Sequence, residues 1–202
     1  MRNMIIAALK KIDNLLFAGF CDQYPKMLER EILGSCETLL EVGCGSRSPI
    51  RRFSRNLQYS VGIDCYAPVI IESRRAAIHN EYKILDALEI GEVFAKKSFD
   101  CVLASDLIEH LSKEDGLKLI AMMEAIARKK VIIFTPNGFL PQNEYAGNEF
   151  QAHLSGWEVD EMKNKGFVSS ESTAGDLCEV SEHASDGARF FCGKESLCGR
   201  KS

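Results

Sequence analysis

The stretch Thr38-Leu-Leu-Glu-Val-Gly-Cys-Gly-Ser46 decides how this chain folds. Its apolar first half predicts a short buried strand, and the two glycines after it predict a tight turn, because glycine adopts backbone conformations that other residues avoid. Glu41 lies near the end of the strand, beside that turn. A glycine turn lets a ligand approach the backbone closely, and the carboxylate of Glu41 indicates that the approaching group is cationic.

The totals of the sequence describe an ordinary globular chain. Its 202 residues suit one α/β domain, and its apolar fraction of 46% is typical of such proteins. The net charge of −4 gives no electrostatic reason to expect nucleic acid as a partner. The eight cysteines form no zinc-like spacing. Cys44, Cys65 and Cys101 lie in or beside predicted strands, which favours small buried hydrophobes in a reducing, cytoplasmic environment.

The first 36 residues are expected to form a helical segment ahead of the main domain, which spans residues 37–202. Apolar residues recur with one-sided helical spacing between residues 5 and 16. Lys10, Lys11 and Asp13 interrupt this run, so it is too short and too charged to span a membrane. A packing helix is the favoured interpretation, and a helix on a membrane surface is the alternative. At the other end, residues 169–202 show weak periodicity, and only 188–192 reads as a strand.

Strands and helices alternate from residue 37 onward. Strands are predicted over residues 37–42, 59–64, 82–85, 99–105 and 130–135. Helices are predicted over residues 49–56, 68–79, 113–128 and 159–165. Such alternation implies right-handed crossovers and parallel strands. The predicted fold is therefore a three-layer, Rossmann-like α/β sandwich with a mostly parallel sheet and helices on both faces, and ligands are expected at the carboxyl ends of the strands.

Acidic side chains lie at the ends of four of these strands. Glu41, Asp64, Asp86 and Asp106 hold these positions. One such residue is usually a helix cap or a solvated turn, but four at the same edge of a sheet indicate a pocket.

Two kinds of ligand compete for this pocket. Asp64 follows the glycines by about twenty residues, the interval at which a carboxylate reaches ribose hydroxyls in dinucleotide sites. Ser48, however, stands where such sites have their third glycine, and Glu41 would repel a pyrophosphate. A ligand with an ammonium, a sulfonium and a ribose but no phosphate suits these residues better, and S-adenosylmethionine is such a ligand.

The chain resembles class I, S-adenosylmethionine-dependent methyltransferases, in particular their type 11 and type 12 groups, from about Thr38 to Phe167. Four segments carry the resemblance: Leu-Leu-Glu-Val-Gly-Cys-Gly at 39–45, Val-Gly-Ile-Asp at 61–64, Leu-Asp-Ala at 85–87, and the strand with its following segment at 99–111. Ser46-Arg47-Ser48 departs from the family pattern, which often has a further glycine there. The resemblance implies a seven-stranded sheet and transfer of a methyl group to an oxygen, nitrogen or carbon atom.

The resemblance also implies roles for the matching residues. Glu41 would face the amino group of the methionine portion, and Gly43 and Gly45 would make room for that portion. Asp64 would accept hydrogen bonds from both ribose hydroxyls, and Cys65 would lie beside the adenine. The remaining cofactor-binding residues that the resemblance implies are Asp86 and Ala87 at the adenine, and Ser105 and Asp106 on the methyl-donor side.

The segment Asp106-Leu-Ile-Glu-His110 is the candidate for chemistry beyond binding. Methyl transfer needs mainly alignment of the nucleophile, and a base only if the acceptor arrives protonated, so His110 is our candidate catalytic base. The segment also resembles the ExxEH motif of ubiquinone-pathway O-methyltransferases and small-RNA 2′-O-methyltransferases. In those families a later histidine completes a metal site, and His153 is the match here. Asp106 is shorter than the glutamate of the motif, so a site of Asp106, Glu109, His110 and His153 stays an alternative, and we assign no metal ligands.

The function predicted from the sequence is S-adenosylmethionine-dependent methylation of a small-molecule acceptor in the cytoplasm. No nucleic-acid partner and no transmembrane segment are expected. One alternative is an NAD(P)-dependent oxidoreductase. The other is a non-catalytic binding or scaffold protein on the same fold, because the usual final pair of strands is hard to find in the tail.

Overall fold

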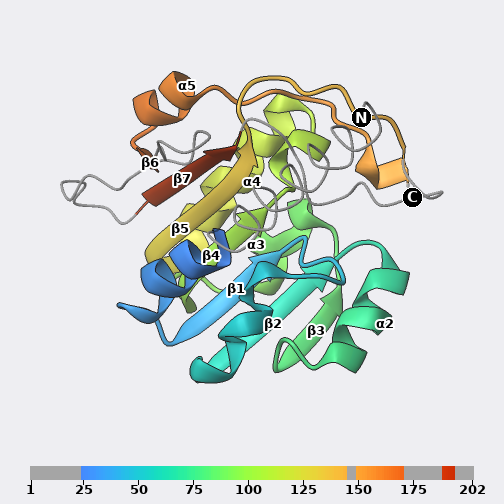
Figure 1. Cartoon of the computed structure of the whole chain (residues 1–202), viewed down its shortest axis with the longest axis vertical. Coiled ribbons are helices and arrows are strands. Elements are labelled where there is room, and N and C mark those ends of the chain that lie inside the picture. Colours follow the sequence, from blue (N-terminus) through green and yellow to red (C-terminus); the bar gives the residue numbers. More distant parts are fainter. Residues whose placement is uncertain (1–23, 145–148, 171–187, 194–202) are drawn as a thin grey trace, which may run out of the picture.

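Seven strands form one central sheet (Figure 1). The computed structural model describes residues 24–144, 149–170 and 188–193. The strands lie in the order β3-β2-β1-β4-β5-β7-β6, and every strand pairing within these ranges is parallel. Their bounds are Thr38–Val42 (β1), Tyr59–Asp64 (β2), Glu81–Ile84 (β3), Phe99–Ser105 (β4), Ala127–Pro136 (β5), Val168–Ser170 (β6) and Ala188–Gly193 (β7).

Helices cover the sheet and join its strands. A first helix spans residues 24–33. The labelled α-helices are Ala67–Ala76 (α2), Ile90–Val93 (α3), Lys113–Ile126 (α4) and Val159–Asn164 (α5). Short 3-10 helices cover Pro49–Arg52 (η1), Ser54–Asn56 (η2), Ala87–Glu89 (η3), Ile108–His110 (η4) and Glu149–Gln151 (η5). In Figure 1, α2 lies beside β3 at one edge of the sheet, and α5 lies beside β6 at the other.

Two apolar cores, one on each face of the sheet, make the molecule three-layered. Alternate residues of a strand point to opposite faces. In β4, Val102 packs with the buried face of α4, whereas Leu103 packs with the helix over residues 24–33 and with η1. Burying each large side chain contributes roughly 1.5–3 kcal/mol before conformational entropy is subtracted. The predicted Rossmann-like sandwich with a seven-stranded parallel sheet is thus confirmed.

The helix predicted over residues 49–56 is instead two 3-10 helices. Ser48 caps η1 through its side-chain oxygen, which accepts a hydrogen bond from the backbone N–H of Ile50. Phe53 ends that helix with its N–H bonded to the Ile50 carbonyl. Ile50 and Phe53 are both buried, and this short, interrupted winding carries both side chains into the same core.

The other predicted elements lie within a few residues of the observed ones. The strands at 59–64 and 99–105 and the strand in the tail are confirmed. Gly166 follows α5 with φ +88°, the left-handed conformation expected of a residue that ends a helix. Cys44 and Cys101 are buried free thiols, whereas Cys65 is exposed.

The start of the described chain packs against the main domain. Leu28 and Ile32 are fully buried and share a core with Leu39 of β1. The amphipathic helix predicted near residues 5–16 lies outside the described residues, as does most of the tail. No helix in the described ranges has the length and apolar character needed to cross a bilayer.

Candidate functional site

The candidate residues gather at the carboxyl edge of the sheet. β1 lies between β2 and β4, so the chain leaves β1 for a neighbour on one side and later returns to the other side. Ligands of parallel α/β sheets bind at such a switch point. The strand order places the ends of β2, β1 and β4 side by side, and with them Asp64, Glu41 and Ser105.

The two glycines of the turn after β1 face different surroundings. Both adopt positive φ angles, +70° at Gly43 and +53° at Gly45, which favour glycine. A Cβ on Gly43 would lie 2.8 Å from Cδ1 of Leu107, so this glycine permits close packing within the protein. A Cβ on Gly45 would meet no atom within 4 Å, so Gly45 borders open space. The open side of the turn is therefore at Gly45.

Asp64 is held by the backbone on both of its oxygens. The N–H of Gly45 donates to Oδ2 at 3.0 Å, and the N–H of Tyr66 donates to Oδ1 at 2.9 Å. Burial raises the pKa of Asp64, and these two hydrogen bonds oppose that rise by stabilising the charged form. Each oxygen keeps a second lone pair, so the carboxylate is oriented and can still accept from a ligand.

Glu41 is a buried carboxylate with two side-chain donors. Ser48 Oγ donates to Oε2 at 2.6 Å, and Nε2 of His79 lies 2.7 Å from the same oxygen. Only 1% of Glu41 is exposed, and the side chain of His79 is 0% exposed. Sequence reasoning missed His79. The signal that could have revealed it is Gly62, a glycine inside a predicted strand, which often marks the close approach of another group.

The residues proposed for the adenine side line the loops after β2 and β3. Asp86 is exposed, and its Oδ1 accepts from the N–H of Leu88, so it caps η3 at its amino end. Ala87, the first residue of η3, is half-buried, and Cys65 is exposed. These side chains therefore lie on the outer side of the site.

Ser105 and Asp106 follow one another at the end of β4. Tyr24 donates its hydroxyl hydrogen to Ser105 Oγ at 2.9 Å, and its ring stacks on Phe134 with centroids 4.0 Å apart. Asp106 has φ +49°, and its N–H donates to the carbonyl of Phe134 at 2.9 Å. The side chain of Asp106 is exposed, so it can meet a ligand directly.

Glu109, His110 and His153 form a compact group of potential metal ligands. One ligand atom from each lies within 4.8 Å of the others, and the two imidazole rings meet edge to face. Glu109 Oε2 accepts from Thr135 Oγ1 at 2.8 Å, whereas its Oε1 is buried with no hydrogen-bond partner in the described residues. Asp106 is not part of this group, but its charge acts on Glu109.

The protonation of the two histidines follows from their carbonyl partners. His110 Nδ1 lies 3.1 Å from the carbonyl oxygen of Ala152, and His153 Nδ1 lies 2.6 Å from that of Leu140. A carbonyl only accepts, so both Nδ1 atoms carry the hydrogen. Burial lowers the pKa of both rings, which favours the neutral form with a free lone pair on Nε2. Metal-binding histidines commonly show this arrangement.

The Glu109 carboxyl next to these histidines has a raised pKa. Burial, and then the charge of Asp106, raises the pKa of Glu109 to about 8. Asp106 is exposed to solvent and Glu109 is only 2% exposed, so Glu109 is the carboxyl that favours its protonated form. A buried carboxyl without a cation beside it keeps its proton more readily, because burial disfavours the charged form.

Backbone contacts fasten the segment that carries His153 to η4. The carbonyl of Glu109 accepts from the N–H groups of Leu154 and Ser155, at 2.8 and 3.1 Å. The indole N–H of Trp157 donates to the carbonyl of Ile108 at 3.2 Å. These contacts bring His153 beside His110, 43 residues earlier in the chain.

Comparison with known proteins agrees with this fold. Residues 40–135 match the family described as the methyltransferase domain. The fold is similar to that of an S-adenosylmethionine-dependent methyltransferase from Archaeoglobus fulgidus, with a TM-score of 0.55 and 17% identity over 81% of this chain and 79% of that one. It is also similar to magnesium protoporphyrin IX methyltransferase from Synechocystis PCC 6803 with bound S-adenosylmethionine, with a TM-score of 0.55 and 14% identity over 84% of this chain and 76% of that one.

A curated relative extends the comparison. The small RNA 2′-O-methyltransferase of Tetrahymena thermophila is 24% identical, and the alignment covers 78% of this chain. The chain spans only 44% of the length of that relative. Residues 40–135 thus match a methyltransferase domain, and the similarity to the solved structures shows a Rossmann-like fold.

Proposed function

We propose that this chain is an S-adenosylmethionine-dependent methyltransferase that binds its cofactor at the carboxyl edge of β2, β1 and β4. The observation that carries the proposal is the hydrogen bond that joins the glycine turn after β1 to Asp64 at the end of β2. Gly45 borders open space, and its N–H orients the Asp64 carboxylate at the rim of that space. Asp64 would accept from the ribose hydroxyls, and the buried Glu41 would face the amino group.

We propose the other cofactor contacts from the positions of the residues relative to the strand ends. Cys65, Asp86 and Ala87 lie in the loops after β2 and β3, where they would flank the adenine. Ser105 and Asp106 end β4, where they would line the methyl-donor side. The exposed carboxylate of Asp106 would lie near the sulfonium and stabilise its positive charge.

The nicotinamide alternative is poorly supported. A pyrophosphate at the turn would meet the Glu41 carboxylate, and Ser48 donates its hydrogen to that carboxylate instead of leaving room for a phosphate. Like charges repel strongly in a buried site. The family match over residues 40–135 also favours methyl transfer.

We further propose that Glu109, His110 and His153 hold a divalent cation. The donor set fits, because within the described residues one buried Glu109 oxygen has no partner and the Nδ1 contacts of the two imidazoles leave their Nε2 lone pairs for a cation. When bound, such a cation would supply Lewis-acid activation of an acceptor hydroxyl. His110 would then be a ligand and not the catalytic base that the sequence indicates, because one lone pair cannot serve both purposes.

The work of the chain's own residues in methyl transfer is mainly alignment. The sulfonium is already an activated leaving group, so the protein needs to hold the acceptor in line with the methyl group and exclude water. The η4 residues and the segment that carries His153 follow β4 and β5, at the carboxyl edge where the acceptor would arrive. A donor side and an acceptor side thus adjoin at the end of β4.

A small-molecule acceptor is the first candidate, as the negative net charge favours. The second candidate is a ribose 2′-hydroxyl of RNA. It is supported by the curated relative, which is named a small RNA 2′-O-methyltransferase, and by the Glu109, His110 and His153 group. Both acceptors would present a hydroxyl oxygen to the methyl group.

A transfer assay tests the proposed function. The protein is incubated with S-adenosylmethionine labelled on its methyl group, with Mn²⁺ or with EDTA, and with either a panel of small hydroxyl compounds or short RNA. RNA with a terminal 2′-deoxyribose is the matched control. Metal-dependent labelling of either class is expected, and loss of RNA labelling with the 2′-deoxy end would select the RNA acceptor. Labelling that is insensitive to EDTA would contradict the metal assignment and return His110 to the role of base.

A further inference from the structure

A buried histidine reaches the Glu41 carboxylate across the neighbouring strand. His79 lies just before β3, and β2 separates β3 from β1 in the sheet. Gly62 of β2 is paired with Glu41 of β1. A Cβ on Gly62 would lie 2.8 Å from His79 Nδ1 and 2.9 Å from its Cε1. The imidazole therefore lies over β2 in space that only a glycine leaves open.

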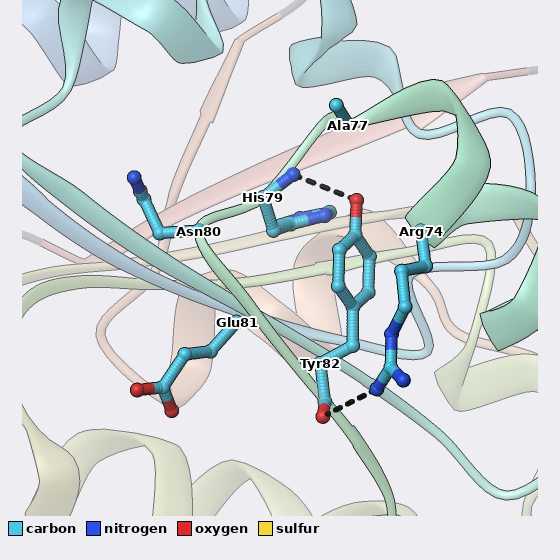
Figure 2. Close-up of a pocket in the computed structure, with 6 residues that line it drawn as sticks. All are labelled: Arg74, Ala77, His79, Asn80, Glu81 and Tyr82. Atoms are coloured by element: carbon cyan, nitrogen blue, oxygen red, sulfur yellow. Dashed lines mark hydrogen bonds between the residues drawn. The ribbon is translucent and has the colours of Figure 1, made fainter.

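The backbone of His79 is anchored by one tyrosine. The hydroxyl of Tyr82 accepts from the N–H groups of Ile78 and His79, at 2.9 and 2.8 Å, and donates to the carbonyl of Ser73 at 2.8 Å. Figure 2 shows the bond from His79 to Tyr82 at the wall of a surface pocket of about 430 Å³. The pocket is lined by Arg74, Ala77, His79, Asn80, Glu81 and Tyr82. Tyr82 thus holds the backbone of His79 on its outer side, and the ring of His79 is hidden from solvent.

Both donors to Glu41 meet the same oxygen. Ser48 Oγ and His79 Nε2 are 2.6 and 2.7 Å from Oε2. Within the described residues, no hydrogen bond reaches the other carboxylate oxygen, Oε1. Two donors on one oxygen fix the rotation of the carboxylate and leave Oε1 for another group.

The tautomer of His79 follows from the same contacts. Nδ1 is buried and has no hydrogen-bond partner in the described part of the chain. A hydrogen on Nδ1 would be an unsatisfied buried donor, whereas a bare Nδ1 lone pair costs less. The contacts therefore favour the tautomer of His79 with its hydrogen on Nε2, which donates to Oε2 of Glu41. This hydrogen bond leaves Oε1 for a donor from outside the protein.

We propose that His79 is a positioning residue that aims Oε1 of Glu41 at the ammonium group of the cofactor. The inference deepens the proposed function and rests on it. His79 would not touch the cofactor, and its effect would reach only the amino-acid end, because Glu41 is the residue through which it acts. The adenosine end would depend on Asp64 and not on His79.

A pair of ligands separates this role from a merely structural one. Calorimetry would measure binding of S-adenosylhomocysteine, which has the amino-acid portion, and of 5′-methylthioadenosine, which lacks it. His79→Gln keeps a nitrogen at the place of Nε2, whereas His79→Asn has its nitrogen only at the place of Nδ1 and falls short of Glu41. Arg74 lines the same pocket and is not a hydrogen-bond partner of Glu41, so Arg74→Ala is the control.

His79→Asn is expected to weaken S-adenosylhomocysteine binding about tenfold, the effect of losing one hydrogen bond to a charged group. Binding of 5′-methylthioadenosine is expected to stay within about twofold in every variant, and His79→Gln and Arg74→Ala are expected to bind both ligands as the wild type does. Adding His79→Asn to Glu41→Ala should weaken binding no further, because the two residues act as a unit.

Two results would overturn the inference while the wild type still binds S-adenosylhomocysteine. One is unchanged binding by His79→Asn, and the other is an equal loss of both ligands. If His79→Asn does not fold, Gly62→Ala displaces the imidazole by another route and carries the same expectation. A wild type that binds neither ligand would contradict the proposed function itself.

Discussion

The backbone N–H of Gly45 donates to Oδ2 of Asp64 at 3.0 Å and ties the glycine turn after β1 to the acid that ends β2. The turn and the acid are 19 residues apart in the chain, yet they meet at one edge of the sheet. The bond keeps the Asp64 carboxylate oriented before a ligand arrives. Preorganisation of this kind lowers the entropic cost of binding.

Asp64→Ala is expected to weaken binding of S-adenosylhomocysteine by about 1–3 kcal/mol, since the carboxylate would accept from the ribose hydroxyls. Asp64→Asn keeps the shape and one acceptor oxygen, so a smaller loss is expected. Calorimetric titration measures both. Unchanged affinity in Asp64→Ala would remove Asp64 from the site.

His153→Ala is expected to abolish Mn²⁺ binding or to weaken it by about 10–100-fold, because one of three ligands is lost. Binding of S-adenosylhomocysteine should stay unchanged, since His153 is not among the proposed cofactor contacts. Titration with Mn²⁺, followed by electron paramagnetic resonance, measures the Mn²⁺ affinity. Calorimetry measures the affinity for S-adenosylhomocysteine. Equal Mn²⁺ affinity of the variant and the wild type would contradict the proposed cation site.

Gly116→Ala is expected to destabilise the fold by about 1–3 kcal/mol, the usual cost of overpacking. A Cβ at this α4 position would clash with Cζ2 of Trp157, whose indole is fully buried and cannot move aside. This cost outweighs the gain of about 1 kcal/mol from replacing a helical glycine by alanine.

Gly91→Ala in α3 is the matched control for Gly116→Ala. Its Cβ would meet Met122 Sδ at 3.2 Å, and a methionine side chain is flexible enough to move. Its stability is therefore expected to stay within about 1 kcal/mol of the wild type. Urea unfolding at neutral pH measures both variants, and an equal effect of the two substitutions would show that Trp157 is not the rigid anchor we describe.

Asp100 is expected to make the free energy of unfolding decrease at acid pH. Burial would raise its pKa, but bonds from the N–H of Glu37 and from Lys129 and the charge of Arg128 more than offset burial, so its pKa is lowered in the folded protein. Protons then bind the unfolded chain more tightly, and the stabilisation is present above the unfolded pKa of about 3.9 and is lost as pH falls below it.

The measurement for Asp100 is urea unfolding of the wild type and Asp100→Asn at pH 7 and near pH 3. At pH 7 the variant should be less stable by about 1 kcal/mol, because the two cationic partners are half-exposed and screened by solvent. Near pH 3 the difference should shrink. A difference that is constant across this range would show that the charge of Asp100 contributes nothing.

Most of the strands were predictable because their signals are local, whereas β6 was not predicted. The apolar residues of β1 and β4 mark them as buried strands, and the glycines after β1 and the acids at the strand ends mark the edge where a ligand is expected. The segment over residues 49–56 was harder. Its composition suits a helix, but the structure has two 3-10 helices there, η1 and η2.

The contacts that tune the site could not be predicted from the sequence. His79 acts on Glu41 from across β2, and only the packing over Gly62 reveals it. The Asp106 to His110 segment was recognised as a possible ligand set together with His153. Its histidine tautomers, however, depend on the carbonyls of Ala152 and Leu140, which carry no signal in residue type.

The central claim is that the carboxyl edge binds S-adenosylmethionine and not a dinucleotide. Calorimetric titration of the wild-type chain with S-adenosylhomocysteine and, separately, with NAD tests it most directly. We predict saturable binding of one S-adenosylhomocysteine per chain, weakened by Asp64→Ala, and no saturable heat with NAD. Saturable binding of NAD without binding of S-adenosylhomocysteine would contradict the account.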